Sequence, residues 1–332
     1  MAKERATILD VARLAGVSVA TVSIVINNNK KYVAPALRQK ISDAIEILNY
    51  KPNLVARSLK VKETKTIALV LTNITSPVTP IIVRTVQMIA SEHGFDTIIS
   101  VTEEDKKIEV DAVYSMLSKR VDGMIICPTS LSLDQHLSYA SSMIPVVAIE
   151  RRNNLTSCVI TDNREICFEA AKHLIGHNRK RIGLISMPIL GSNTQDRILG
   201  VQSALKEHGL FYPELTKETD YIGQSSFNLA VDLISNQHVD AIMTTSQSIA
   251  LGTYKAAKAL GATVPDNLAI FGYDDVSWME VVDSPISTIK QPIKEMAERA
   301  CRALFDALKA ETNTPRIDVL KSELIIRHSC GC

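Results

Sequence analysis

Residues 7–27 carry a pattern that leaves few choices of local fold: two short amphipathic helices separated by a turn that contains glycine. Thr7 and Asp10 have close to the spacing of a capping box, and Gly16 stands where a left-handed residue ends a helix. Ser18 is placed to cap the second helix. Apolar residues at helical spacing give each helix one face to bury: Ile8, Val11, Ala12 and Ala15, then Val22, Val25 and Ile26. This is the layout of a helix-turn-helix, whose second helix enters the major groove of DNA.

The charge distribution also favours a nucleic-acid partner. The whole chain has a net charge of only +1, but residues 1–60 hold ten Lys and Arg against four Asp and Glu. The other residues hold 27 basic and 32 acidic side chains, so a positive head precedes a mildly negative body. A solvated basic face is the alternative explanation. Together with the helix-turn-helix pattern, the charge indicates a head that contacts DNA phosphates.

Two further segments complete the head. Pro35 and the apolar stripe that ends at Leu48 predict a third helix over 35–48. Residues 53–59 can form a short helix, but seven residues are too few to persist as a helix alone in water. We therefore expect this segment to fold only against DNA, as a hinge followed by a polar connector at 60–66.

After residue 66 the pattern changes to short apolar runs that alternate with helical patterns. Eight such runs predict strands: 67–71, 97–101, 123–127, 146–149, 159–161, 182–186, 241–244 and 268–271. Alternating strands and helices predict parallel sheets covered on both faces. Eight strands over this length favour two Rossmann-like lobes, with a ligand cleft between the carboxyl ends of their strands.

Short motifs spread along the chain resemble those of the lactose-repressor and galactose-repressor family of bacterial transcription regulators. They lie at 7–12, 15–18, 20–23, 50–53, 56–59, 121–123, 272–275 and 287–292. The resemblance implies a helix-turn-helix head at 1–50, a hinge helix and linker at 51–66, and an α/β core at 67–332 like the periplasmic sugar-binding proteins. The expected lobes are an N-lobe, about 67–162 and 293–319, and a C-lobe, about 163–290 and 323–332.

The family resemblance also implies partners. It implies a dimer or tetramer, and we expect a homodimer on a pseudo-palindromic site in double-stranded DNA because the sequence ends at Cys332 without a heptad extension. A small effector, most simply a sugar or sugar derivative, is expected between the lobes. No cofactor is expected.

Positions carried over from the family predict the DNA contacts. Val19, Ala20 and Ile24 correspond to positions that face base edges, and Ser18, Thr21, Ser23 and Asn27 to positions that contact phosphates. Many relatives have Arg or His where this chain has Ile24, and Arg can bind guanine through two hydrogen bonds. Ile24 can only contact a thymine methyl group or exclude water. Packing in the core of the head is the alternative role for Val19 and Ile24.

In the hinge, Leu59 matches the leucine that inserts into the central base step from the minor groove, with Lys60 and Arg57 beside it. A packing role in a loose linker is the alternative for Leu59. Ala34 and Leu37 stand where relatives often have Ser and Thr at the start of the third helix. This departure is expected to remove a helix cap and a phosphate contact.

In the core, Arg197 and Asp274 match family positions that contact the effector, the first at a helix start and the second at a strand end. A surface ion pair and a turn are their alternative roles. Ser76, Thr129, Arg151 and Ser246 are further candidates, because ligands gather at strand ends. The chain lacks the Asn-Asp that relatives show near Ser246 and the aromatic pair near Ser76, so the relatives' sugars cannot be assumed. Arg151, Arg152 and Arg197 leave a phosphorylated or other anionic effector open, and a nucleobase is a further alternative.

Several other classes are disfavoured. The sequence has neither a long apolar run nor a signal peptide, so we expect a cytoplasmic protein without a membrane partner. The chain has no GxSxG, P-loop or HExxH motif, which argues against an enzyme. A binding protein of transport type would not need a basic head, whereas a DNA-binding dimer that needs no ligand stays open.

The six cysteines show no paired CxxC motifs, and we expect them to be reduced. Cys330 and Cys332 could bind a metal or oxidise, but no further His or Cys is in register with them in the sequence. We therefore predict no metal site.

Overall fold

The computed structural model describes residues 6–26, 32–50, 63–129, 135–220, 225–310 and 314–332. The chain divides into two compact units, residues 1–64 and 65–332, which are described separately below. The predicted hinge helix at 53–59 lies outside the described residues, and so do the candidate residues Asn27, Arg57, Leu59 and Lys60.

The first unit contains three helices, α1 (Ile8–Ala15), α2 (Val19–Ile26) and α3 (Pro35–Ile47), which confirm the helices predicted from the sequence. A small apolar core joins them. Val11, Ala12, Val22, Ile41 and Ala44 are its buried members. Ile8, Ala15, Val25 and Ile26 are partly buried against this core, as their spacing predicts.

The N-terminal ends of α1 and α3 differ, because a side chain accepts a hydrogen bond from the first-turn amides of α1 but not from those of α3. At α1 the capping box is complete, because the Thr7 side chain accepts from the Asp10 amide and the Asp10 carboxylate accepts from the Thr7 amide. Gly16 ends the helix with a left-handed φ of 67°. At α3 the N-cap residue is Ala34, which makes no side-chain cap. The absence of a cap agrees with the prediction made from alanine at position 34. Pro35, in the first turn, is the residue that favours the start of this helix.

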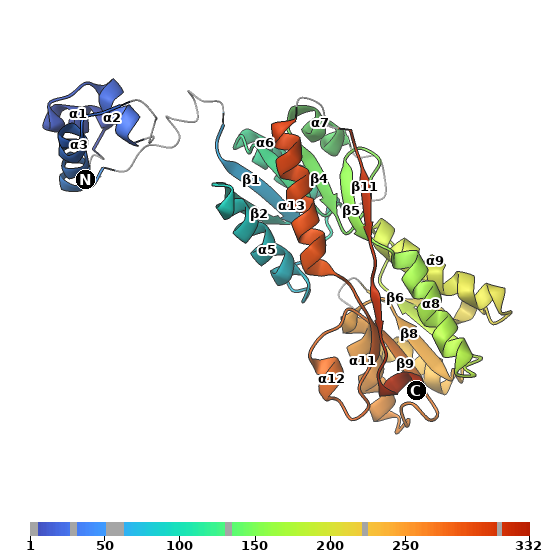
Figure 1. Cartoon of the computed structure of the whole chain (residues 1–332). Helices are drawn as coiled ribbons and strands as arrows, with labels where there is room; N and C mark the ends of the chain where they lie inside the picture. The colour runs from blue at the N-terminus through green and yellow to red at the C-terminus, as the bar shows by residue number, and fades with distance from the viewer. Residues whose placement is uncertain (1–5, 27–31, 51–62, 130–134, 221–224, 311–313) are drawn as a thin grey trace. The chain divides into compact units, whose positions relative to one another are not determined.

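The second unit contains two six-stranded sheets, which confirm the prediction of two α/β lobes (Figure 1). The N-lobe sheet has the order β11-β5-β4-β3-β1-β2. All of its pairings are parallel. Its strands are β1 (Thr66–Leu71), β2 (Asp96–Val101), β3 (Gly123–Ile126), β4 (Val146–Ile149), β5 (Ser157–Thr161) and β11 (Ile317–Leu320).

The C-lobe sheet has the order β12-β10-β9-β8-β6-β7. Its strands are β6 (Ile182–Ser186), β7 (Thr216–Glu218), β8 (Ala241–Thr244), β9 (Ala269–Tyr273), β10 (Ser287–Lys290) and β12 (Glu323–Ile325). The pairings are parallel except that β12 runs antiparallel to β10. This edge strand departs from the predicted all-parallel arrangement.

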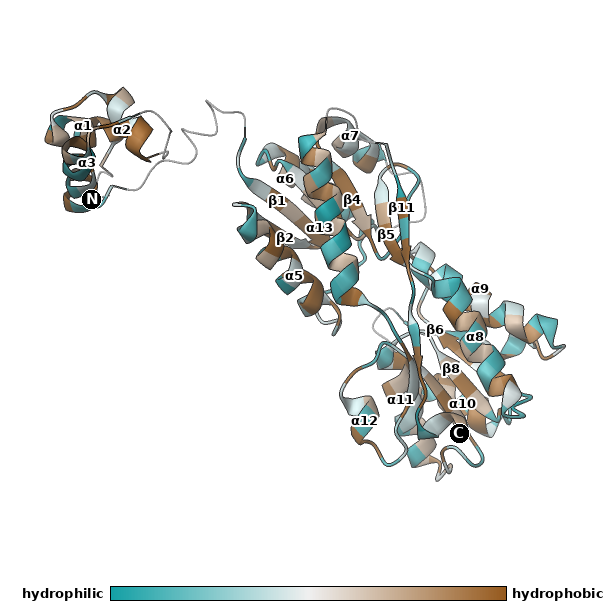
Figure 2. Ribbon diagram, viewed as in Figure 1, coloured by the Kyte–Doolittle hydropathy of each residue, from teal (hydrophilic) through white to brown (hydrophobic). Residues whose placement is uncertain are grey.

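Helices cover both faces of each sheet. In the N-lobe, α5 (Thr79–Glu92) and α13 (Ile293–Lys309) pack on one face, and α6 (Lys106–Ser118) and α7 (Gln135–Met143) on the other. In the C-lobe, α8 (Asn163–Gly176) and α9 (Ser192–Glu207) pack on one face, and α10 (Ser226–Ser235) and α11 (Gln247–Ala259) on the other. Figure 2 shows hydrophobic residues concentrated in the strands, with hydrophilic residues on the outward sides of α8, α9 and α13. A short helix, α12 (Trp278–Val281), and the 3-10 turns η1 (Pro213–Leu215) and η2 (His328–Cys330) complete the C-lobe.

The chain passes between the two sheets three times: after β5, after β10 and after β11. The three crossing segments are connected to one another by hydrogen bonds and an ion pair. The Thr161 hydroxyl donates to Gln291 Oε1 at 2.9 Å, and the Ser322 amide donates to Asp162 Oδ1 at 2.8 Å. The ammonium of Lys321 lies 3.3 Å from Asp162 Oδ2. The lobes are therefore joined by three hydrogen-bonded segments rather than by one flexible linker.

All eight predicted strands are present, but four strands were missed. β7, β10, β11 and β12 have three or four residues each. β7 is entirely polar and the other three mix polar with apolar side chains, so none has the continuous apolar run of the predicted strands. Three of them lie at sheet edges, where one side of the strand has no neighbour. β10 lies inside its sheet, yet its buried residues include Ser287 and Thr288.

Among the described residues, no single helix is long and apolar enough to span a membrane. α1 and α2 pass the test of length and composition only when taken together, across a bend of 105°. Part of their apolar surface is buried in the head core, which includes Val11, Ala12 and Val22.

The uncapped start of α3 predicts that the Ala34→Ser substitution will stabilise the head. A serine hydroxyl at the N-cap can accept from an amide of the first turn, which contributes about 1 kcal/mol. Hydrogen exchange of the α3 amides should slow by about fivefold, as expected for that change in opening free energy. Thr7→Ala is the matched control and should speed exchange in α1. Unchanged exchange in the Ala34→Ser protein would contradict the prediction.

Candidate DNA-binding surface and effector pocket

The side of α2 that carries Val19, Ala20 and Ile24, called its outer edge here, is apolar and accessible to solvent. Val19 is 38% exposed, Ala20 is exposed and Ile24 is half-buried. Neither Val19 nor Ile24 belongs to the head core, whose members on this helix are Val22, Val25 and Ile26. This placement weighs against the alternative role of Val19 and Ile24 as core residues.

The predicted phosphate-contacting residues that the structure describes lie at the start and middle of α2. Ser18 Oγ accepts from the Thr21 amide at 3.2 Å, so Ser18 caps this helix as predicted. The Ser18 and Thr21 hydroxyls are 2.8 Å apart. Ser23 is half-buried.

Seventeen described residues enclose a pocket of about 120 Å³ between the two lobes. The N-lobe contributes Thr72, Asn73, Ser76, Val78, Thr79, Glu104, Glu150 and Arg151; the C-lobe contributes Met187, Pro188, Leu190, Asn193, Thr194, Arg197, Ser246 and Asp274; and Gln291 lies on a crossing. The polar residues follow the carboxyl ends of β1, β2 and β4 in one sheet and of β6, β8, β9 and β10 in the other. This is where parallel α/β sheets bind ligands.

Arg197 is buried in this pocket and its guanidinium is held in place. Nε donates to Asn163 Oδ1 at 2.8 Å, and Nη1 donates to the Thr245 carbonyl at 3.0 Å. The guanidinium lies 3.7 Å from the centre of the Tyr273 ring, whose hydroxyl donates to the same Asn163 oxygen at 2.6 Å. Among the described residues no hydrogen bond uses Nη2, so Arg197 can donate to a ligand without losing its own support.

Asp274 connects the pocket to a crossing between the lobes. Its Oδ1 accepts from Gln291 Nε2 at 2.7 Å, and Gln291 in turn accepts from the Thr161 hydroxyl. Burial raises the pKa of Asp274, opposed by the charge of Arg197 and by the hydrogen bond from Gln291. A ligand that bonds to Asp274 therefore contacts a chain of hydrogen bonds that reaches the crossing after β5.

Arg151 forms a buried pair with Glu104. Nη1 donates to Glu104 Oε2 at 2.6 Å and Nη2 to Oε1, and Nη1 also donates to the Pro128 carbonyl at 3.0 Å. The Arg151 side chain lies against Gly191 of the C-lobe, where any Cβ atom would overlap it. Glycine at 191 thus allows an N-lobe arginine to approach the start of α9.

Of the remaining candidate effector residues, two line the pocket and one lies outside it. Ser76 and Ser246 line the pocket, and Ser246 also caps α11 by accepting from the Ile249 amide at 3.4 Å. Thr129 lies outside the lining residues. Its amide donates to Glu109 Oε2 at 2.6 Å, and its hydroxyl donates to the same oxygen, so Thr129 belongs to a buried network under α6.

The three acidic residues that line the pocket share an unusual backbone conformation. Glu104, Glu150 and Asp274 have φ values of 59°, 64° and 64°, in the left-handed region that residues other than glycine seldom adopt. Such strained residues gather at functional sites. Burial also raises the pKa of Glu150, whose Oε2 lies 3.6 Å from the Cys127 thiol.

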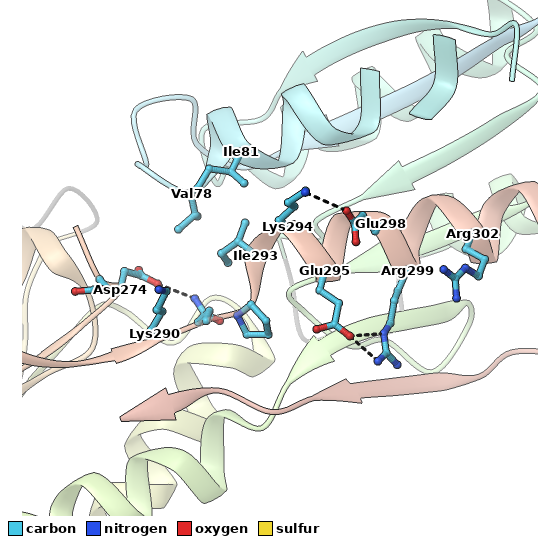
Figure 3. Close-up of a pocket in the computed structure, with 13 residues that line it drawn as sticks. Val78, Ile81, Asp274, Lys290, Ile293, Lys294, Glu295, Glu298, Arg299 and Arg302 are labelled. Atoms are coloured by element: carbon cyan, nitrogen blue, oxygen red, sulfur yellow. Dashed lines mark hydrogen bonds and ion pairs between the residues drawn. The ribbon is translucent and has the colours of Figure 1, made fainter. Parts of the chain in front are cut away.

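A second, larger hollow of about 820 Å³ lies beside the crossing after β10 (Figure 3). It is lined by the first turns of α13, with Val78 and Ile81 on the opposite side and Asp274 at one end. Four of its charged residues form pairs: Arg299 lies 2.6 Å from Glu295, and Lys294 lies 3.6 Å from Glu298. We take the smaller pocket as the candidate ligand site, because its polar groups converge from both lobes.

Sequence reasoning missed several residues of the pocket. Asn163, Tyr273 and Gln291 hold Arg197 and Asp274, and Glu104 and Glu150 line the wall next to Arg151. Tyr273 and Gln291 stand inside motifs that carry the family resemblance, and Glu104 follows a predicted strand. The rule that ligands gather at strand ends would have found Glu104 had it been applied to the strand at 97–101.

Comparison with known proteins agrees with this architecture. Residues 7–53 match the model of bacterial regulatory proteins of the lacI family, and residues 171–330 match a periplasmic binding protein-like domain. The chain is 31% identical over 332 residues to the ribose operon repressor of Haemophilus influenzae, with 98% of each chain covered. It is 29% identical to a transcriptional regulator CelR solved in complex with cellobiose, at a TM-score of 0.71 over 98% of this chain and 100% of that one.

A crystal structure of the lac repressor dimer bound to operator and the anti-inducer ONPF shares the fold, with a TM-score of 0.88 at 24% identity over 98% of this chain and 99% of that one. The chain belongs to the lacI family of bacterial regulatory proteins, and it is a DNA-binding transcriptional repressor of that family rather than an enzyme.

The acidic residues of the pocket predict unequal losses of stability from two similar substitutions. Glu104→Gln leaves Arg151 buried without its carboxylate partner, which should lower the free energy of unfolding by about 3–5 kcal/mol. Glu150→Gln removes a buried carboxyl and should cost little at neutral pH. Urea unfolding of the full chain measures both.

The same pair predicts a pH dependence. Because burial raises the pKa of Glu150, its favourable contribution is fully present at low pH and is lost as the pH rises through that raised value. The stability of the Glu150→Gln protein relative to the wild type should therefore increase with pH. Equal losses for the two variants at neutral pH would contradict this account of the pocket.

Proposed function

We propose that this repressor acts as a homodimer on a pseudo-palindromic DNA site, and that a small, neutral, polyhydroxylated effector bound between its lobes controls its affinity for DNA. A single helix-turn-helix offers few base contacts, and a two-fold pair doubles them. The observation that carries the effector proposal is the balance of charge in the pocket.

The pocket contains no excess of positive charge. Two arginines line it, Arg151 and Arg197, against the three acids Glu104, Glu150 and Asp274. Arg151 is paired with Glu104, and Arg152, outside the lining, is paired with Asp196 at 2.7 Å. These pairs weigh against the anionic effector that the three arginines left open. Carboxylates and a fixed guanidinium are instead suited to bind several hydroxyl groups.

Pocket size and composition further support a sugar of one ring. The volume of about 120 Å³ is small beside the roughly 300–1,000 Å³ of pockets for drug-sized ligands. Of the described residues that line it, none is aromatic, which disfavours a flat nucleobase held by stacking. The names of two relatives, a ribose operon repressor and a regulator in complex with cellobiose, support a carbohydrate.

A thermal-shift screen of the full chain tests the effector class. Pentoses, hexoses, their phosphates and nucleobases are compared, and a ligand at 100 times its Kd should add about 2.7 kcal/mol of stability. We expect a neutral sugar to raise the Tm and its phosphate to have little effect. Asp274→Asn and Arg197→Lys should abolish the shift, whereas Glu298→Gln, in the second hollow, should keep it.

Other results of this screen would contradict the proposal. A shift given only by sugar phosphates would indicate an anionic effector, and one given only by a nucleobase would indicate a different class. The active ligand is then added to an operator-binding assay with the wild-type protein. If no ligand changes either the Tm or the affinity for DNA, the protein is a DNA-binding dimer that needs no effector.

The apolar edge of α2 gives a prediction for the DNA. With Val19, Ala20 and Ile24 facing the bases, selection should rest on thymine methyl groups and DNA shape. Ile24→Arg should add a preference for guanine of roughly 1–3 kcal/mol at one symmetric pair of positions. Binding-site selection with both proteins measures this preference, and Arg38→Gln, on α3, serves as a control that should leave base preference unchanged. A strongly selected guanine at that position for the native protein would contradict the placement of α2.

A further inference from the structure

Four side chains with metal-binding atoms converge at one place in the C-lobe, away from the effector pocket. His173 Nε2 lies 3.3 Å from Cys330 Sγ and 3.3 Å from Cys332 Sγ. His177 Nε2 lies 3.1 Å from Cys332 Sγ, and the two sulfur atoms are 3.3 Å apart. The cluster therefore brings together two imidazole nitrogens and two thiols.

The end of α8 supplies both histidines on one face. His173 and His177 are four residues apart, and the His177 amide donates to the His173 carbonyl at 3.2 Å, so the helical turn is complete. Their ring centres are 4.7 Å apart. Both residues are half-buried, so they lie at the surface of the lobe rather than in its core.

The last residues of the sequence supply the two cysteines. Ser329 anchors this segment, because its hydroxyl donates to the Ile270 carbonyl at 2.6 Å and accepts from the Ser287 amide at 2.9 Å. Gly331 has a left-handed φ of 101°, a conformation that glycine adopts without strain, and it turns Cys332 back toward α8. Cys330 is fully buried and Cys332 is exposed.

Hydrogen bonding alone explains this arrangement poorly. The Cys332 thiol has one proton, yet its sulfur contacts two imidazole nitrogens and the Cys330 sulfur. A thiol is a weak donor, and a neutral imidazole offers only one acceptor nitrogen. The same four atoms are strong ligands of a metal ion once the thiols lose their protons.

We propose that His173, His177, Cys330 and Cys332 bind one Zn²⁺ ion. Two thiolates and two imidazoles are a donor set that zinc prefers in tetrahedral geometry. Zinc–ligand bonds of about 2.3 Å to sulfur and about 2.0 Å to nitrogen would place two sulfurs about 3.8 Å apart and a sulfur and a nitrogen about 3.5 Å apart. The four separations given above are within about half an ångström of these values. The ligand atoms of His173, His177 and Cys332 all lie within 4.8 Å of one another, and rotation of the Cys330 side chain would complete the set.

Four protein ligands leave no open position on the ion, so the proposed role is structural rather than catalytic. The ion would join the end of α8 to η2 and to the chain beyond it. The Ser287 hydroxyl donates to Cys330 Sγ at 3.1 Å. This hydrogen bond would stabilise the negative charge of a metal-bound Cys330 thiolate, and it links the site to β10. None of the four residues lines the effector pocket, so this proposal is independent of the proposed function.

Metal analysis of the full chain tests the site. The protein is expressed without a polyhistidine tag in medium supplemented with zinc, purified under reducing conditions and assayed by plasma mass spectrometry. We expect about one zinc per chain. Cys332→Ser and His177→Gln should each lose most of it, while Cys301→Ala and His208→Gln, which alter a cysteine and a histidine elsewhere, should keep it. Cys332 is exposed near the end of the chain, so its loss should not prevent folding.

Cobalt substitution gives a second readout that does not depend on retention of zinc. The protein with Co²⁺ should show the visible bands of a tetrahedral ion and sulfur-to-metal charge transfer, both absent from Cys332→Ser. A chelator should lower the Tm of the wild type but not of that variant. Zinc below a tenth of an equivalent without cobalt bands, equal loading of all variants, or a Cys330–Cys332 disulfide as the state found in cells would each overturn the proposal.

Discussion

The three hydrogen-bonded crossings between the sheets are the constraint on which the rest of the core depends. Because Thr161, Gln291 and the segment around Ser322 lie on different crossings, these hydrogen bonds hold the crossings together, and a change in the angle between the lobes must bend all three. Gln291 belongs to a crossing and also donates to Asp274 in the pocket. Ligand binding and the arrangement of the lobes therefore share one residue, which gives an effector a physical route to the joint between them.

Local signals in the sequence predicted the head well. The cap formed by Thr7 and Asp10, the turn at Gly16 and the apolar spacing of α1 and α2 depend on residues within one or two helical turns. The core strands with continuous apolar runs were predicted for the same reason. β10 was missed because its burial comes from the neighbouring strands β9 and β12 and not from its own composition, which includes Ser287 and Thr288.

The candidate pocket could be predicted only in outline. Family resemblance supplied Arg197 and Asp274, and the rule for strand ends supplied Ser76, Arg151 and Ser246. Their partners come from distant parts of the chain: Asn163 lies 34 residues from Arg197, and Glu104 lies 47 residues from Arg151. No local pattern marks such pairs. The cluster at Cys332 is the extreme case, since its partner His177 is 155 residues away.

The composition of α2 has a consequence for how ionic strength acts on this repressor. None of its eight residues is ionisable, so any charged groups of the head that meet phosphates lie outside this helix, where Arg13 on α1 and Arg38 on α3 are candidates. Release of counterions on binding is set by those groups and does not depend on base sequence. Added salt should therefore weaken binding to the operator and to random DNA in parallel, while the ratio of the two affinities stays nearly constant.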